Sequence, residues 1–390
     1  MVLGFCRREN FADMVNVFLI GVASRIVVFF SAIVSSDMFA IRTALPNEGL
    51  WDLGLPFVNL FSRWDAGWYI KIAISGYPPG NNPVSQRWAW FPLYPATMRV
   101  VGQPLMLFYP PDQAVALAGF LISNIFFFVS LIIFYELSKN ILASQKLALL
   151  SVLFFAFWPG SLFYSCVYSE SLFMTFALGA FCLLEKEKQP KAVLLGFLAG
   201  LTRSNGFIVF IPFLHKGIEK RSVTLVLQSV IVASPYLLFN LYGYLATAAF
   251  PVREIVAQQY WEKPTFLFEQ LSRCNLGYQT LLSTEIILIL LPFIYLFTSK
   301  SLAISTFSCG LKETHKESKY FAFAIVQLVV LLFFTLVFNV HRYAIPMIPL
   351  YWVAAKTWSR NQILGIALFG LFTMLLSIGT ILFATWRWFL

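Results

Sequence analysis

The residues of this chain that are best suited to chemistry lie in the stretch Ser62-Arg63-Trp64-Asp65-Ala66-Gly67-Trp68-Tyr69-Ile70-Lys71. Asp65 lies there between two tryptophans and two cations. A carboxylate in such a setting can take a proton from a substrate hydroxyl. Aspartate is scarce in the chain, and the remaining ones are Asp13, Asp37, Asp52 and Asp112.

Several common chemistries lack their motifs. The chain has no Asp-x-Asp pair that could hold a metal and a nucleotide-sugar diphosphate, and no glycine-rich phosphate loop. The 5 cysteines form no C-x-x-C pair, and none of the 3 histidines lies in an H-E-x-x-H pattern. We therefore expect no metal and no cofactor, and neither ATP-driven transport nor nucleotide-sugar chemistry on a soluble fold.

A sugar already carried on a lipid phosphate is the alternative donor. Transfer from it needs a carboxylate that takes the proton of the acceptor hydroxyl, and cations that hold the departing phosphate. Asp65 can supply the carboxylate, and Glu170 is the second catalytic candidate. The candidate ligands of the donor phosphate or of the substrates are Arg342, His341, Arg203, Asn205, Arg63, Arg25 and Tyr343.

The composition requires these residues to be positioned by membrane helices. Of the 390 residues, 59% are hydrophobic and only 12% are charged, against roughly a quarter charged in soluble domains. Lipid is therefore the expected solvent. The net charge of +10 is spread over short connectors, which fits the positive-inside rule and argues against a nucleic-acid partner.

The apolar segments predict an all-α polytopic membrane protein with about 9–11 transmembrane helices, counting short broken ones. The run 14–34 is predicted to be an uncleaved first membrane helix. The other clear segments are 114–138, 223–245, 281–298, 320–339 and 361–386.

Three further segments are predicted to be broken. The run 147–184 should form two helices that meet at a polar hairpin between Trp158 and Glu170. The run 192–214 has Arg203 at its centre, where a single spanning helix would place a charge at mid-bilayer. Two half-helices that meet at Thr202–Gly206 avoid this cost. The segment 343–356 is short and interrupted by prolines.

Counting positive charges on the connectors predicts a cytoplasmic N-terminus. The same assignment places four polar motifs together on the outer face. They are Arg63-Trp64-Asp65, Tyr168-Ser169-Glu170, Arg203-Ser204-Asn205 and His341-Arg342-Tyr343. We therefore expect one active site on the lumenal or outer side.

Two intervals between apolar segments are predicted to be external, 35–113 and 246–280. Leu60, Phe61, Trp64, Trp68 and Ile72 recur at helical spacing, which predicts an interfacial helix over 57–75. The aromatic run 88–95 should not form a regular helix. Residues 1–390 are interpreted as a single integral-membrane domain.

The motifs closely resemble the GPI mannosyltransferase 2 (PIG-V type) family of the glycosyltransferase C superfamily. The resemblance runs through most of the chain, in the same order. It is carried by Ser24-Arg25-Ile26, Arg63-Trp64-Asp65, Ser75-Gly76-Tyr77, Trp90 to Pro95, Pro159 to Tyr164, Tyr168 to Phe173, Gly200 to Gly206 and His341-Arg342-Tyr343.

The resemblance implies a membrane-embedded, inverting transferase that uses dolichyl- or polyprenyl-phosphate mannose. It implies addition of mannose in α1,6 linkage to a lipid-linked glycan, in the endoplasmic reticulum membrane of a eukaryote. The short loops also fit a prokaryotic relative, which would work in the plasma membrane on another glycolipid or glycan. Membrane lipids and a small membrane-protein subunit are the other partners considered.

Structural alternatives stand beside these roles. Asp65 could pair with Arg63, Glu170 could cap a helix, and Arg25 could pair with Glu136. The four tryptophans Trp64, Trp68, Trp88 and Trp90 are interpreted as interface anchors rather than sugar platforms. For the whole chain, the rival functions are a secondary transporter, which predicts two related halves that the sequence does not show, and a non-catalytic scaffold subunit.

Overall fold

A computed structural model describes residues 8–39, 52–80, 84–260, 276–298, 316–334 and 340–387. The described part is built from helices and contains no strand. Five helices are long and apolar enough to cross a membrane. They are α1 (Arg8–Met38), α5 (Pro111–Leu142), α10 (Val223–Thr247), α13 (Leu276–Thr298) and α18 (Gln362–Ala384). The predicted all-α polytopic membrane fold is confirmed.

The predicted breaks are also present. The hairpin between α6 (Gln145–Phe157) and α7 (Glu170–Glu185) contains the 3-10 helix η3 (Pro159–Tyr164). After α8 (Gln189–Gly200) the chain leaves the helix, passes through η4 (Ser204–Val209) and continues as α9 (Phe210–Glu219). The later short helices are α15 (Ser318–Phe334), α16 (Val340–Tyr343) and α17 (Ile348–Arg360). The prolines and polar turns therefore end helices where the sequence predicts.

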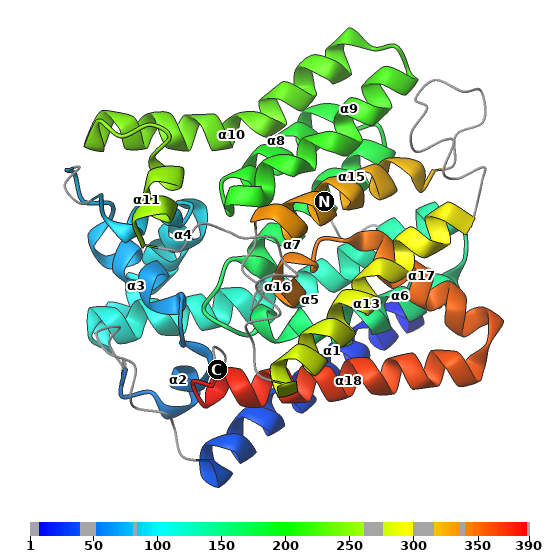
Figure 1. Cartoon of the computed structure of the whole chain (residues 1–390), viewed down its shortest axis with the longest axis horizontal. Coiled ribbons are helices and arrows are strands. Elements are labelled where there is room, and N and C mark those ends of the chain that lie inside the picture. Colours follow the sequence, from blue (N-terminus) through cyan, green and yellow to red (C-terminus); the bar gives the residue numbers. More distant parts are fainter. Residues whose placement is uncertain are drawn as a thin grey trace.

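The helices pack around α5, which runs through the middle of the molecule against α6 and α7 (Figure 1). On one side α1 lies along α18, and on the other side α8 and α9 pack against α10. Large aromatic side chains fill the space between α5, α6 and α17, where the Phe155 ring packs edge-on against Tyr351 at 5.1 Å. This packing holds the polar turns of distant segments in fixed positions.

The single interfacial helix predicted over 57–75 is wrong. The chain forms α2 (Pro56–Phe61) and then α3 (Ala66–Ser75), separated by Ser62–Asp65. Trp64 has a φ of 55° in this break, a left-handed conformation that a helix does not contain and that is uncommon for a residue other than glycine. The helical spacing of the apolar residues is compatible with both forms, so periodicity alone could not show the break.

The aromatic run 88–95 is also more regular than expected. It begins in η1 (Gln86–Ala89), and from Leu93 onward it forms α4 (Leu93–Gly102), which is followed by η2 (Pro104–Leu107). Trp88 is fully buried, and its Nε1 donates a 3.0 Å hydrogen bond to the carbonyl of Pro78. Trp90 is buried too. Both therefore pack inside the protein, and their interpretation as membrane-interface anchors is wrong.

The two intervals predicted to be external thus contain helices. The first carries α2, α3 and α4, and the second carries α11 (Val252–Tyr260). Residues 40–51, 81–83 and 261–275 of these intervals lie outside the described residues.

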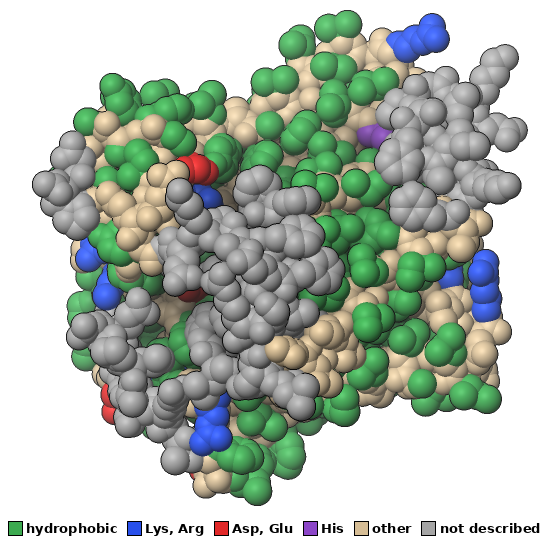
Figure 2. Space-filling view, viewed as in Figure 1, with side chains coloured by type: hydrophobic (Ala, Val, Ile, Leu, Met, Phe, Trp, Pro, Cys, Tyr) green, Lys and Arg blue, Asp and Glu red, His purple; other side chains and the backbone are tan. Residues whose placement is uncertain are grey.

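The surface agrees with a lipid environment. Hydrophobic side chains are spread over the described part of the face seen in Figure 2, and lysine and arginine lie mainly near its margins. Exposed large apolar residues follow α10, including Leu227, Leu237 and Leu245. A soluble protein rarely exposes so much contiguous apolar surface. The chain is an integral membrane protein.

Candidate active site

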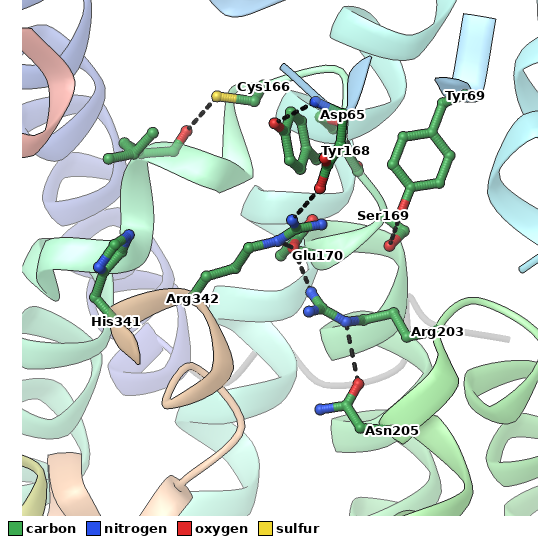
Figure 3. Close-up of polar contacts among 12 residues, drawn as sticks. Asp65, Tyr69, Cys166, Tyr168, Ser169, Glu170, Arg203, Asn205, His341 and Arg342 are labelled. Carbon is green, nitrogen blue, oxygen red and sulfur yellow. Dashed lines mark hydrogen bonds and ion pairs between the residues drawn. The ribbon is translucent and has the colours of Figure 1, made fainter. Parts of the chain in front are cut away.

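Four charged side chains from four separate segments form one continuous chain of contacts (Figure 3). Arg342 donates from Nη1 to Oδ2 of Asp65 at 2.6 Å, and from Nε to Oε1 of Glu170. Arg203 donates from Nη1 to the same Glu170 oxygen. The order Asp65–Arg342–Glu170–Arg203 pairs two carboxylates with two guanidinium groups. The structure brings together the four motifs that the charge pattern placed on one face.

Burial distinguishes the two carboxylates. The side chain of Asp65 is 34% exposed, whereas that of Glu170 is 0% exposed. Arg342 and Arg203 are nearly as buried as Glu170. Asp65 is therefore the open end of the chain of contacts, and its Oδ1 is bonded to no described residue. Glu170 neutralises two buried cations that would otherwise be costly to place there.

The backbone around Asp65 is held by Tyr168. The Tyr168 hydroxyl accepts a 3.0 Å hydrogen bond from the Asp65 amide and donates one of 3.1 Å to the Arg63 carbonyl. One hydroxyl thus bridges the break between α2 and α3. The Tyr168 ring also lies 4.5 Å from the guanidinium carbon of Arg342. Tyr168 sets the separation between Asp65 and its cationic partner.

Glu170 is the first residue of α7, directly after the polar hairpin. The hairpin is tied to neighbouring elements by the Val167 amide, which donates to the Phe61 carbonyl at 2.9 Å, and by Ser169 Oγ, which lies 3.1 Å from the Tyr69 hydroxyl. A carboxylate in the first turn of a helix also interacts favourably with the helix dipole. The N-cap of α7 is Ser169, so Glu170 does not cap the helix, and its side chain serves the ion pairs with Arg203 and Arg342.

Arg203 lies in the break between α8 and η4, and its Nε donates to Asn205 Oδ1 at 3.3 Å. The Asn205 amide donates in turn to Gln327 Oε1 of α15 at 3.3 Å. The Tyr343 ring centre lies 5.5 Å from the Arg203 guanidinium carbon. The break requires Gly206, because a Cβ there would be 2.5 Å from the Ala199 carbonyl oxygen. Asn205 and Tyr343 therefore border the site through Arg203.

His341 precedes Arg342 but faces another partner. Its Nδ1 lies 3.1 Å from Oε2 of Glu285 in α13, and its ring stacks on Phe163. Its carbonyl accepts a 2.8 Å hydrogen bond from Trp158 Nε1. Figure 3 shows the imidazole away from Glu170 and Asp65. The imidazole therefore does not point toward the carboxylates that Arg342 contacts. The role of His341 as a ligand of the donor phosphate or of the substrates stays a prediction.

Arg25 also lies in a separate network. Its guanidinium donates to the Ser161 carbonyl at 3.0 Å and to the Ser165 hydroxyl at 2.8 Å, and it lies over the Phe127 ring. The alternative pairing with Glu136 is wrong, because serine groups of the hairpin take its hydrogen bonds. Arg25 stabilises η3 and contacts none of the four charged residues Asp65, Arg342, Glu170 and Arg203.

Arg63 is close to Asp65 in sequence but does not pair with it. Its guanidinium carbon lies 5.3 Å from the centre of the Trp386 ring, and its side chain makes no hydrogen bond with a described residue. The alternative that Asp65 simply pairs with Arg63 is therefore wrong.

Sequence reasoning missed Tyr69, Glu285, Gln327 and Trp386 as neighbours of the site. Glu285 and Gln327 carried a usable signal, since a lone polar residue in an apolar helix is costly and usually has a partner in the protein. Trp386 follows the last helix, far from the other motifs, and no pattern in the sequence relates it to Arg63.

The chain is similar in sequence to known proteins. The family model described as "Mannosyltransferase (PIG-V)" matches residues 52–263. A Schizosaccharomyces pombe protein named GPI mannosyltransferase 2 is 32% identical over 154 residues, which are 39% of this chain and 31% of that protein. A Rattus norvegicus protein named GPI alpha-1,6-mannosyltransferase 2 is 25% identical over 228 residues, 54% of this chain and 45% of that protein.

The matches to these curated relatives span less than half of the relatives' length. Among solved structures, an oligosaccharyltransferase from Archaeoglobus fulgidus aligns with a TM-score of 0.46 and 12% identity, over 93% of this chain and 53% of that one.

Proposed function

Because the chain belongs to the PIG-V mannosyltransferase family, matched over more than half of its length, we propose that it is a membrane-embedded, inverting mannosyltransferase. The donor is polyprenyl- or dolichyl-phosphate mannose, and the acceptor is a lipid-linked glycan. The names of the relatives support a GPI-type acceptor and an α1,6 linkage. In a prokaryotic cell the acceptor is instead another glycolipid or glycan.

One observation carries this proposal: a partly exposed carboxylate is fixed at the end of an otherwise buried chain of charges. Asp65 is held through Oδ2 by Arg342 and through its amide by Tyr168. Its Oδ1 is left for a substrate. A general base must reach the proton that it removes while keeping a fixed orientation. Asp65 meets both conditions, and the fully buried Glu170 does not meet the first.

In the proposed reaction Asp65 orients the acceptor hydroxyl. The hydroxyl oxygen attacks the anomeric carbon of mannose, and its proton passes to Asp65 Oδ1. The bond between that carbon and the phosphate oxygen breaks, and the lipid phosphate leaves with the electron pair. Attack opposite the leaving group inverts the anomeric configuration. The transition state of glycosyl transfer resembles an oxocarbenium ion, with positive charge on the sugar ring.

The other charged residues act on the position of Asp65. Arg342 holds it, Glu170 holds Arg342, and Arg203 completes the neutralisation of Glu170. Asn205 and Tyr343 orient Arg203. We assign His341 and Arg25 to positioning, because His341 fixes the turn that carries Arg342 and Arg25 fixes η3 next to it.

The predicted topology places this site on the lumenal face of the endoplasmic reticulum membrane, or on the outer face of a plasma membrane. The donor's polyprenyl chain then enters from the lipid between helices. Membrane lipids surround the apolar surface, and a small membrane-protein subunit remains a prediction.

The test is a transfer assay with the purified chain in lipid nanodiscs. We expect labelled mannose to pass from dolichyl-phosphate mannose to a glycolipid acceptor carrying a terminal mannose, and not from GDP-mannose. Transfer from GDP-mannose alone, or absence of transfer to every glycolipid and glycan acceptor offered, would contradict the proposal. Nuclear magnetic resonance of the product would establish the linkage and the inversion.

A further inference from the structure

Arg63 is a buried cation without a hydrogen-bond acceptor in the described part of the chain. Only 6% of the residue is exposed, and its Nε is fully buried without a partner. Its guanidinium lies over the Trp386 ring instead. Burying a charged group without paired oxygen atoms is costly. A position of this kind is expected where a ligand supplies the missing anion.

The other candidate arginines have oxygen partners for their guanidinium groups, although Nε of Arg25 is also buried without one. Arg342 is bonded to both Asp65 and Glu170, Arg203 is bonded to Glu170, and Arg25 is bonded to serine groups of the hairpin. The charge of Arg342 is already neutralised by these two carboxylates, and a further anion bound there would be repelled by them. Arg63 needs to break no ion pair, so it is the better ligand for an incoming anion.

The carboxylate that influences Arg63 most is Asp52, and it is used elsewhere. Oδ1 of Asp52 accepts hydrogen bonds of 2.9 Å from the Gly54 amide and from Asn59 Nδ2. Burial lowers the pKa of Arg63 to about 10, and the attraction to Asp52 only partly opposes this. Arg63 therefore stays charged at neutral pH.

Trp386 contributes a second unsatisfied donor beside Arg63. It follows α18, and its ring packs 4.9 Å from the ring of Trp64 and under the Arg63 guanidinium. Its Nε1 is buried and has no partner among the described residues. Figure 1 shows the C-terminal end of α18 next to α2, which places this donor at the break that carries Arg63.

The position of Arg63 relative to Asp65 is fixed. The hydroxyl of Tyr168 bonds to the carbonyl of Arg63 and to the amide of Asp65. The segment that carries Arg63 therefore also carries the proposed base. Phosphate oxygens are the preferred acceptors of a guanidinium fork.

We propose that Arg63 and Trp386 bind the phosphate of the lipid-linked sugar, and that Arg342 does not. This inference rests on the proposed function, because it assigns the donor's leaving group to a place in the same site. It makes Trp386 a binding residue and reduces Arg342 to a positioning residue for Asp65. The phosphate, once released with its lipid, remains paired with Arg63 until it leaves.

The test uses farnesyl phosphate, which carries a lipid phosphate but no sugar. Its binding to the purified chain in phosphatidylcholine nanodiscs is compared with that of farnesol and of inorganic phosphate. We expect Arg63→Met to weaken farnesyl phosphate binding roughly tenfold to a hundredfold, the range expected for a lost charged hydrogen bond. Arg63→Lys should weaken it less, and Trp386→Phe should weaken it roughly tenfold or less. Arg99→Met, at an exposed position of α4, should leave it unchanged.

A second measurement separates ligand binding from a structural role. Without ligand, Arg63→Met should unfold at a higher temperature than the parent chain, because it removes a buried charge that no group of the described chain neutralises. A structural arginine would show the opposite sign. Farnesyl phosphate should raise the unfolding temperature of the parent chain and not of Arg63→Met.

Unchanged farnesyl phosphate affinity in Arg63→Met would overturn the inference, whatever the transfer assay shows. Equal affinity for farnesyl phosphate and inorganic phosphate would overturn the assignment to a lipid. If the parent chain transfers mannose but Arg63→Met and Trp386→Phe keep its dependence on donor concentration, only this inference fails. If farnesyl phosphate binds through Arg63 but no mannose is transferred, only the proposed function fails.

Discussion

Nη1 of Arg342 donates a 2.6 Å hydrogen bond to Oδ2 of Asp65, across 277 positions of the sequence. The same guanidinium bonds to Glu170 through Nε, so one side chain joins an accessible carboxylate to a buried one. Arginine is suited to this because its donors lie in a fixed planar fork. Because only Asp65 is accessible, Asp65 and Glu170 have different tasks, and substitutions at each residue should have different effects.

Asp65→Asn should keep the shape of the site while removing the base. We expect transfer to fall by about 10²- to 10⁴-fold, the usual contribution of a general base, with the unfolding temperature little changed. The check is the initial rate with labelled dolichyl-phosphate mannose. Asp37→Asn, at an exposed position of α1, is the matched control. Near-parental transfer by Asp65→Asn would show that Asp65 is not the base.

Glu170→Gln should act first on stability. It leaves Arg203 and Arg342 without the carboxylate that neutralises them in a buried place, so we expect a loss of about 3–5 kcal/mol. Thermal unfolding of the purified chain measures it. Glu187→Gln removes the exposed pair with Lys220 and should leave the unfolding temperature almost unchanged, because water and salt screen such a pair. Equal losses for the two variants would contradict the role given to Glu170.

Arg342→Lys retains the charge but loses the fork. A lysine is a point charge that cannot reproduce both the Nη1 and the Nε hydrogen bond in this geometry. We expect the transfer rate to fall roughly tenfold to a hundredfold, while the affinity for farnesyl phosphate stays near that of the parent chain. A selective loss of farnesyl phosphate affinity in Arg342→Lys would show that Arg342 binds the donor phosphate.

Gly160→Ala tests whether the hairpin positions Arg342. A Cβ at residue 160 would clash with the His341 carbonyl oxygen, and the turn that carries Arg342 would have to move. A displacement of about 1 Å at such a site can lower the rate roughly 10²-fold. Gly370→Ala in α18 meets no atom within 4 Å and should stabilise its helix by about 0.5–1 kcal/mol. Full activity of Gly160→Ala would refute the positioning role.

Cysteine labelling tests the predicted topology. Ser204→Cys, at the polar break, should react with a membrane-impermeant maleimide from the lumenal or outer side. Glu187→Cys, at an exposed connector between α7 and α8, should react from the cytoplasmic side. The parent chain corrects for its native cysteines. Reaction of both positions from the same side would show that the four motifs do not share the outer face.

The sequence by itself determined the membrane class, most helix boundaries and the residues that belong together. Long apolar runs can be stable only in lipid, and prolines and polar turns end helices locally, so the breaks before Glu170 and at Arg203 could be predicted. The positive charges on the connectors indicated that the motifs of Asp65, Glu170, Arg203 and Arg342 lie on the same face.

The tertiary structure decided which of these charges pair and which one remains accessible. Contacts such as Arg342 with Asp65, His341 with Glu285 and Arg63 with Trp386 join segments far apart in the chain, and local periodicity contains no information about them. The break at Trp64 was hidden for the same reason, since it is held by Tyr168 from another helix. Burial at that break makes Asp65 the open end of the ion pairs and leaves Arg63 without an acceptor among the described residues, because only packing sets which groups water can reach.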